Sequence, residues 1–215
     1  MTSHQHPAAG SLIYRIGRAP EPRAWPPANI EGRYSHPEGA VRVLYGASER
    51  RAAFLETLQS FRPALADLAA LKKRMDLPPD FPGSASPDLI PADYFRRRLA
   101  MFRVPTTEPM LDLCSPATHA LLRRELAAAL LSGGYSGAFN FGEVIGSDYR
   151  LTQLIARWAH DHEYTGVAYP SAHDHSLTCW AVFDTASIIL LGEPEPIPRD
   201  DPDLHLAAIL FGLRL

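Results

Sequence analysis

Residues 32–58 constrain the fold most, because they predict three kinds of backbone in direct succession. A loop comes first, since Pro37 and Gly39 interrupt any regular pattern. Residues 41–45 then alternate side chains in the way that is typical of a short strand. The serine that opens residues 48–61 is a preferred N-cap, and the apolar spacing after it predicts a helix to the end of that range.

One polar side chain falls on each of these three predicted elements. Arg33 is in the loop, Tyr45 ends the strand, and Glu56 lies on the helix, opposite its apolar arc. If the elements converge, a cation, a phenol and a carboxylate could surround one small ligand. Taken one at a time, they are typical of a surface or salt-bridged arginine, a half-buried strand tyrosine and a solvated glutamate.

The chain of 215 residues is long enough to bury a core as one domain, or as a large domain with a subdomain. We predict a polar, flexible leader over residues 1–11 and a single domain over 12–215. Further strands are predicted at 12–16, 99–104, 110–113, 166–169, 178–183, 186–191 and 204–213. Further helices are predicted at 65–75 and 91–98, from 115 or 118 to 131, and from a cap at 147 or 148 to about 162.

Predicted strands are concentrated towards both ends of the chain, with helices between them, which favours a mixed α+β fold with largely antiparallel sheets and surrounding helices. The glycine-rich residues 135–146 are predicted to be either a flap over a pocket or a plain loop. They do not match a phosphate-binding nucleotide loop, since no GKS or GKT follows. Residues 193–202 are rich in proline and predict a connection.

Composition and charge argue against several classes of function. A net charge of −3 gives no general attraction to nucleic acid or to an anionic membrane surface. No apolar run approaches the ~18 residues that a membrane span needs. We expect no signal peptide, since the first ten residues have no basic start followed by an apolar run. The two cysteines, Cys114 and Cys179, suggest neither a metal knuckle nor a disulfide framework, so we expect the reducing cytoplasm.

Two pairs of histidines and one serine are further candidates. His160 and His162 fall on a predicted helix, where positions two apart do not face each other, so no metal site is predicted there. His173 and His175 lie in a polar turn, where solvated histidines are the simplest interpretation, and the role of all four is left open. Ser171 is not in a G-x-S-x-G nucleophile motif, so it either donates a hydrogen bond to a ligand or caps a turn.

A set of short motifs occurs in order between about residues 12 and 190. They are Tyr14-Arg15, Gly32-Arg33-Tyr34 with Pro37 and Gly39, Leu44-Tyr45, Ala53 to Glu56, Thr152-Gln153, Gly166 to Ser171, and Trp180 to Phe183. In order and spacing they resemble the RES domain, a family of NAD-degrading toxins named for an arginine, a glutamate and a serine. The usual pair of glycines before the loop arginine is here Glu31-Gly32.

The resemblance implies a fold like that of ADP-ribosylating toxins and an enzyme that cleaves the nicotinamide–ribose bond of NAD. NAD is then the substrate, no cofactor is implied, and the acceptor is water or inorganic phosphate. Glu56 would stabilise the positive charge that develops on the ribose. Arg33 and Tyr45 would share the catalytic role, with Arg33 on the diphosphate and Tyr45 at the nicotinamide–ribose end.

The resemblance also assigns substrate-binding residues and partners. Arg15 would bind the diphosphate, and Ser171 would donate a hydrogen bond to the nicotinamide or its ribose. Tyr34 is a third substrate-binding residue that the resemblance implies. A protein antitoxin is implied as a partner, and a homo-oligomer is compatible with the family. The biological role would be that of a bacterial growth-inhibiting toxin.

Two other functions stay open on the sequence alone. One is an ADP-ribosyltransferase that modifies a macromolecule, and the other is a non-catalytic domain that binds NAD or a partner. The sequence leaves the acceptor, the antitoxin and the oligomeric state undetermined.

Overall fold

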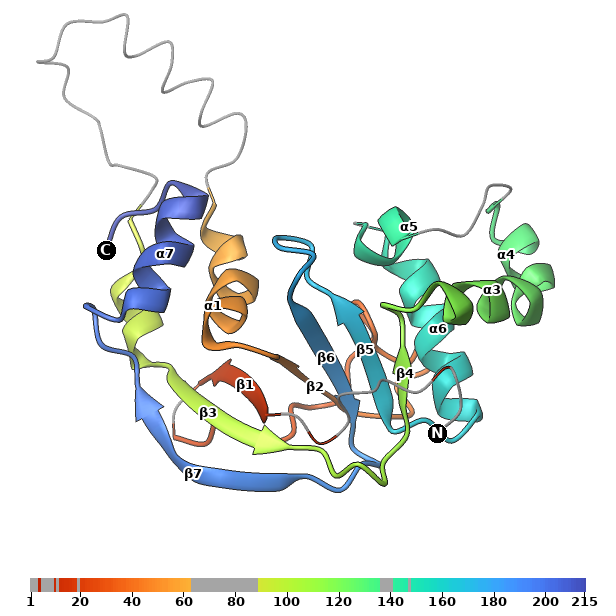
Figure 1. Ribbon diagram of the computed structural model, residues 1–215, viewed down its shortest axis with the longest axis horizontal. Coiled ribbons are helices and arrows are strands. Elements are labelled where there is room, and N and C mark those ends of the chain that lie inside the picture. The colour runs from red at the N-terminus through yellow and green to blue at the C-terminus, as the bar shows by residue number, and fades with distance from the viewer. Residues whose placement is uncertain are drawn as a thin grey trace, which may run out of the picture.

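A computed structural model describes residues 4, 10, 12–18, 20–62, 89–135, 141–146 and 148–215 (Figure 1). Its strands are β1 (Leu12–Gly17), β2 (Val43–Ala47), β3 (Arg98–Arg103), β4 (Met110–Asp112), β5 (Gly166–Pro170), β6 (Thr178–Phe183) and β7 (Ile189–Pro196). Its α-helices are α1 (Arg50–Leu58), α3 (Pro116–Glu125), α4 (Ala127–Ser132), α5 (Phe141–Ile145), α6 (Tyr149–Asp161) and α7 (Pro202–Phe211). Short 3₁₀ helices are η1 (Gln59–Phe61) and η2 (Ala92–Arg96).

The seven strands form one sheet in the order β4-β5-β6-β2-β1-β3-β7. Neighbouring strands pair antiparallel, except for the parallel pair of β4 and β5. This architecture confirms the predicted mixed α+β fold with a largely antiparallel sheet. In Figure 1, α1 and α7 lie together at one side, and α3 to α6 lie at the other.

Both faces of the sheet are apolar, as β6 shows most clearly. Cys179, Ala181 and Phe183 belong to the larger core, which the helices share. Trp180 and Val182 belong to a smaller core on the opposite face. Successive side chains of a strand point to opposite faces, so an almost continuous apolar run is what a central, doubly covered strand requires.

Several predicted elements are confirmed. The structure has strands at 12–17, 98–103, 110–112, 166–170 and 178–183, and the short helix expected within 91–98 is η2. Helix α6 begins as predicted after Asp148, whose side chain accepts a hydrogen bond from the Arg150 N–H. None of the helices in the described residues combines the length and the apolarity needed to cross a bilayer.

The start of α1 differs from the prediction. Its N-cap is Glu49, not Ser48, and the α-helical part ends at Leu58 before continuing as η1. The Ser48 hydroxyl instead accepts a hydrogen bond from the Thr178 N–H at 3.2 Å. Ser48 therefore connects the beginning of α1 to β6, so a residue type that suits a helix cap is used here for a tertiary contact.

The prediction of a final strand at 204–213 is wrong, because these residues belong mainly to α7. Asp201 caps the helix by accepting from two backbone N–H groups, Pro202 occupies its first turn, and Gly212 ends it at φ +66°. One face packs on α1, while the other exposes apolar side chains, so the sequence lacks the amphipathic period that predicts a helix. The exposed apolar residues are Leu206, Ile209 and Leu210.

Other boundaries also differ. The helix predicted at 115–131 is divided into α3 and α4 at Leu126, and the segment predicted as a loop at 135–146 contains α5. The strand predicted at 41–45 is β2, two residues further along. The helix predicted at 65–75 and most of the predicted leader lie outside the described residues.

Strand β7 forms one edge of the sheet and begins later than predicted. It extends into the segment that was expected to be a proline-rich connection, and it contains Pro194 and Pro196. Its pairing with β3 shifts register between Leu99 and Met101. Ile189 and Leu190 at its start are about half exposed.

Asp201 supplies a test of the α7 assignment. It is 4% exposed, and its carboxylate also binds Arg50 Nη2 on α1 at 2.6 Å. Asp201→Ala removes the helix cap and a charged hydrogen bond, so we expect the free energy of unfolding to fall by about 1–3 kcal/mol. Urea denaturation measures this change, and the exposed neighbour Asp200 gives the control Asp200→Ala. Equal stability of the two variants would contradict the described cap.

Candidate functional site

A cavity of about 260 Å³ brings together elements that are far apart in the sequence. Its wall includes side chains from β1, β2, α1 and β5, and from the α5–α6 region. Four of the predicted site residues line it: Arg15, Arg33, Tyr45 and Glu56. The loop, the strand and the helix of residues 32–58 therefore each contribute a side chain to the wall of one cavity.

Glu56 projects from α1 towards the end of β5. Its Oε1 accepts a hydrogen bond from the Ser171 hydroxyl at 2.8 Å, and Ser171 Oγ in turn accepts from the His173 N–H at 3.2 Å. Ser171 is fully buried and is not part of the cavity wall. In this structure the Ser171 hydroxyl binds one oxygen of Glu56 and so fixes the orientation of the carboxylate.

Cys179 is a second donor to the same oxygen. Its Sγ lies 3.3 Å from Glu56 Oε1. Burial, and next the nearby Glu56, raise the pKa of the Cys179 thiol well above its usual range, so the thiol stays protonated and donates. Cys179 is not among the site residues predicted from the sequence, because a cysteine within an apolar strand gives no signal beyond burial.

Arg15 reaches the cavity from β1. Its Nε donates to the Pro22 carbonyl and its Nη1 to the Tyr45 carbonyl, both at 2.8 Å. Burial lowers the pKa of Arg15 to about 10, so the guanidinium is still charged at neutral pH. Its hydrogen bonds to backbone carbonyls set the direction of the side chain and leave its charge uncompensated by any described carboxylate.

Arg33 connects the loop before β2 to the α5–α6 region. Its Nη1 donates to the Val144 carbonyl at 3.1 Å and to the Gly146 carbonyl at 2.5 Å. Its guanidinium also lies 4.7 Å from the centre of the Tyr149 ring, within the range of a cation–π interaction. Within the described part of the chain, Arg33 has no ion-pair partner.

Tyr45 is a largely buried phenol at the back of the cavity. Its hydroxyl oxygen accepts a hydrogen bond from the Tyr34 N–H at 2.9 Å. Burial raises the pKa of Tyr45 to about 12, so the hydroxyl is neutral at physiological pH. A Cβ atom on Gly32 would lie 2.8 Å from this hydroxyl, so the glycine allows the loop to approach so closely.

Tyr34, a predicted substrate-binding residue, lies behind the cavity wall. It is fully buried, it does not line the cavity, and its ring centre lies 4.5 Å from that of Tyr169. Tyr169 itself forms part of the wall, so Tyr34 supports the wall from behind. Wall residues that were not predicted as site residues include Thr57, Gln59, Ile145, Tyr149 and Tyr169.

His160 and His162 have different ring partners in the structure. His162 stacks on Trp158 with ring centres 4.0 Å apart, while the ring of His160 lies 5.5 Å from that of His36. His173 Nε2 lies 3.1 Å from Gln59 Oε1 beside the cavity. The expected separation of His160 and His162 on a helix is therefore confirmed.

The charges of the cavity define what it can do. Two guanidinium groups without carboxylate partners favour a ligand that carries phosphate or another anion. Glu56 faces the same cavity with no ion-pair partner among the described residues and could stabilise positive charge that develops on a bound molecule. The arrangement suits a ligand with an anionic part and a reacting centre that becomes cationic.

Comparisons with known proteins agree with the fold. The family model described as the RES domain matches residues 12–206. The structure is similar to that of the M. tuberculosis MbcT-MbcA toxin-antitoxin complex, with a TM-score of 0.57, 15% sequence identity, and coverage of 97% of this chain and 91% of that chain. No curated protein matches the sequence significantly.

At this low identity, the solved structure establishes a likeness of fold and nothing more. The family match, by contrast, spans most of the chain and includes every residue described around the cavity. The protein therefore belongs to the RES domain family.

Proposed function

We propose that this protein cleaves the nicotinamide–ribose bond of NAD. The observation that carries the proposal is that Arg15, Arg33 and Glu56 line one cavity, with both arginines lacking carboxylate partners among the described residues. Membership in the RES domain family supports it, since the family resemblance implies NAD as the substrate. NAD combines a diphosphate with a cationic nicotinamide, so it matches both charged parts of the cavity.

The two arginines would bind the diphosphate. Arg33 uses only Nη1 for the carbonyls of the α5 region, and Arg15 uses Nε and Nη1 for backbone carbonyls. Each guanidinium therefore keeps N–H donors for phosphate oxygens, and charged hydrogen bonds of this kind orient a ligand as well as bind it.

Glu56 would act on the sugar. When nicotinamide leaves as a neutral molecule, positive charge develops on the ribose, and a nearby carboxylate stabilises that charge. Ser171 and Cys179 hold Oε1, so Oε2 is the oxygen available to a ribose hydroxyl or to the acceptor. Tyr45, neutral and fixed by Tyr34, would form a wall beside the nicotinamide end.

The acceptor would be water or inorganic phosphate, giving ADP-ribose or a phosphorylated ADP-ribose. We also propose that a protein antitoxin binds this chain, because the similar solved structure is a toxin–antitoxin complex. The biological role would then be growth inhibition by depletion of NAD.

Glu56→Gln tests the proposed chemistry. The amide keeps the size of the side chain and removes its charge, so we expect nicotinamide release from NAD to fall by about 10²–10³-fold. Chromatography of the reaction products measures this release. Glu49→Gln, at an exposed position of the same helix start, is the matched control. A wild-type protein that releases no nicotinamide, or a fully active Glu56→Gln, would refute the proposal.

Arg33→Gln tests the proposed diphosphate contact. Loss of a charged hydrogen bond of this kind weakens binding by about 1.5–3 kcal/mol, so KM for NAD should rise about 10–100-fold. Arg18→Gln, an exposed position next to β1, should leave KM unchanged. An unchanged KM in Arg33→Gln, with the melting temperature of the wild type, would remove Arg33 from the binding site.

The acceptor is tested by incubation with NAD in phosphate-free buffer and after addition of inorganic phosphate. A phosphorylase forms its product and consumes NAD only when phosphate is present, whereas a glycohydrolase forms ADP-ribose with and without phosphate. Label from NAD that appears on a macromolecule instead would indicate ADP-ribosyl transfer.

A further inference from the structure

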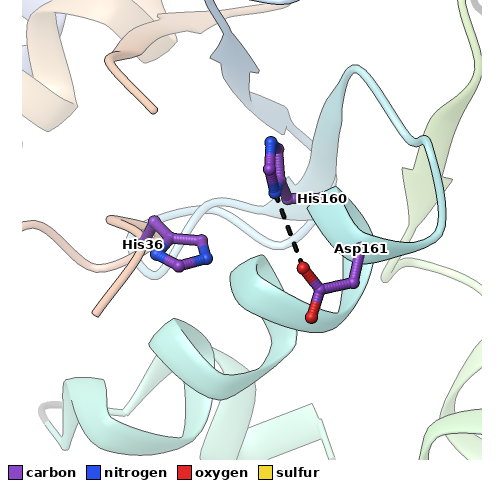
Figure 2. Close-up of side chains that lie close together, drawn as sticks. All are labelled: His36, His160 and Asp161. Atoms are coloured by element: carbon purple, nitrogen blue, oxygen red, sulfur yellow. Dashed lines mark ion pairs between the residues drawn. The ribbon is translucent and has the colours of Figure 1, made fainter. Parts of the chain in front are cut away.

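Three potential metal ligands lie together away from the cavity, between the loop before β2 and the end of α6. They are His36, His160 and Asp161, and one nitrogen or oxygen atom of each lies within 4.8 Å of the others. Figure 2 shows the His36 ring directed towards the space beside His160 and Asp161. Only the last two are neighbours in the sequence, so the group is created by the fold.

His36 is held in place from one side. It is 4% exposed, and its Nδ1 accepts from the Glu38 N–H at 3.2 Å, so Nε2 is the nitrogen left for a ligand. A metal would bind the neutral imidazole, in which one ring nitrogen carries no proton.

His160 contributes the least satisfied atom of the group. Its Nδ1 is buried and has no hydrogen-bond partner among the residues that the structure describes. The nearest carboxylate oxygen, Asp161 Oδ1, is 3.7 Å away, which is too far for a hydrogen bond. A buried polar atom without a partner lowers stability, so this nitrogen is better satisfied when something occupies the space beside it.

We propose that His36 Nε2, His160 Nδ1 and the Asp161 carboxylate bind a divalent transition metal, with Zn²⁺ as the best match. Two imidazoles and one carboxylate are typical ligands of Zn²⁺, whereas Mg²⁺ and Ca²⁺ prefer oxygen ligands alone. Three protein ligands leave the fourth tetrahedral position to water.

The geometry requires only local adjustment. Ligand atoms of a tetrahedral zinc ion lie about 3.4 Å apart, so atoms that now lie within 4.8 Å of one another must approach by up to about 1.4 Å. The Asp161 side chain is 54% exposed at the last residue of α6 and is free to rotate. Binding through Nε2 places the remaining proton of His36 on Nδ1. Nδ1 can then no longer accept from the Glu38 N–H, so this 3.2 Å hydrogen bond is lost when the metal bond forms.

The neighbouring charges permit this change. Arg157 lies 3.8 Å from the Asp161 carboxylate and 3.0 Å from that of Glu38. When Asp161 turns to a metal, Arg157 keeps Glu38 as its partner. The bound metal would connect α6 to the loop that also carries Arg33, three residues before His36, and would stabilise that loop.

The test uses the full chain freed of metal, with Zn²⁺ and Co²⁺ as probes. Calorimetry should show Zn²⁺ binding, and Co²⁺ should give the absorption of a four-coordinate site. A 100-fold excess of Zn²⁺ over its Kd should raise the melting temperature by about 5–10 °C. Mg²⁺ should produce neither signal.

Variants assign the ligands. His160→Ala and Asp161→Ala should each weaken Zn²⁺ binding by about tenfold or more, and should lose the Co²⁺ absorption. His162→Ala, a histidine on the same turn that stacks on Trp158, is the control and should bind as the wild type does. Because Asp161 is exposed, its variant retains the fold even if His160→Ala does not.

Absence of Zn²⁺ binding in the wild type would overturn the proposal. Binding of equal strength in the wild type and in Asp161→Ala, with an unchanged Co²⁺ spectrum, would also overturn it, because the metal would then be held by other residues.

Discussion

The hydrogen bond between Ser171 Oγ and Glu56 Oε1 is the contact on which the site depends. It joins α1 to the end of β5, across 115 positions of sequence. A carboxylate that is partly withdrawn from water needs donors, and Ser171 and Cys179 supply two. The β5–β6 register, in which Tyr169 is opposite Cys179, brings both donors to the same end of the sheet. The pairing of β5 with β6 therefore also positions the two hydrogen-bond donors that the Glu56 carboxylate needs.

The sequence predicted the elements that carry the site residues better than the contacts between those elements. Local pattern placed Arg33, Tyr45 and Glu56 on a loop, a strand and a helix, and the structure confirms those three elements. Their convergence depends on tertiary contacts, such as the hydrogen bond from the Tyr34 N–H to the Tyr45 hydroxyl, which no local pattern specifies. Only the family resemblance could favour a cavity over three solvated side chains. Cys179 stayed hidden because its role comes from a neighbour that is distant in sequence.

The errors in the predicted fold have the same origin. Apolar periodicity fails for α7, which is apolar on its buried and its exposed face, although Asp201 and Pro202 carry the usual signs of a helix start. Proline content suggested a connection where β7 continues, since an edge strand tolerates proline. His160 was considered only with His162, its neighbour in sequence, whereas the fold places it beside His36.

The edge position of β7 has a consequence for how this protein behaves at high concentration. Pro194 and Pro196 remove two N–H donors from the strand, and Glu193 and Glu195 add negative charge beside them. Another chain that extended the sheet from β7 would find fewer N–H donors in this part of the strand and would meet the exposed charge of Glu193. The apolar start of the strand is thus exposed next to a segment that discourages fibre growth.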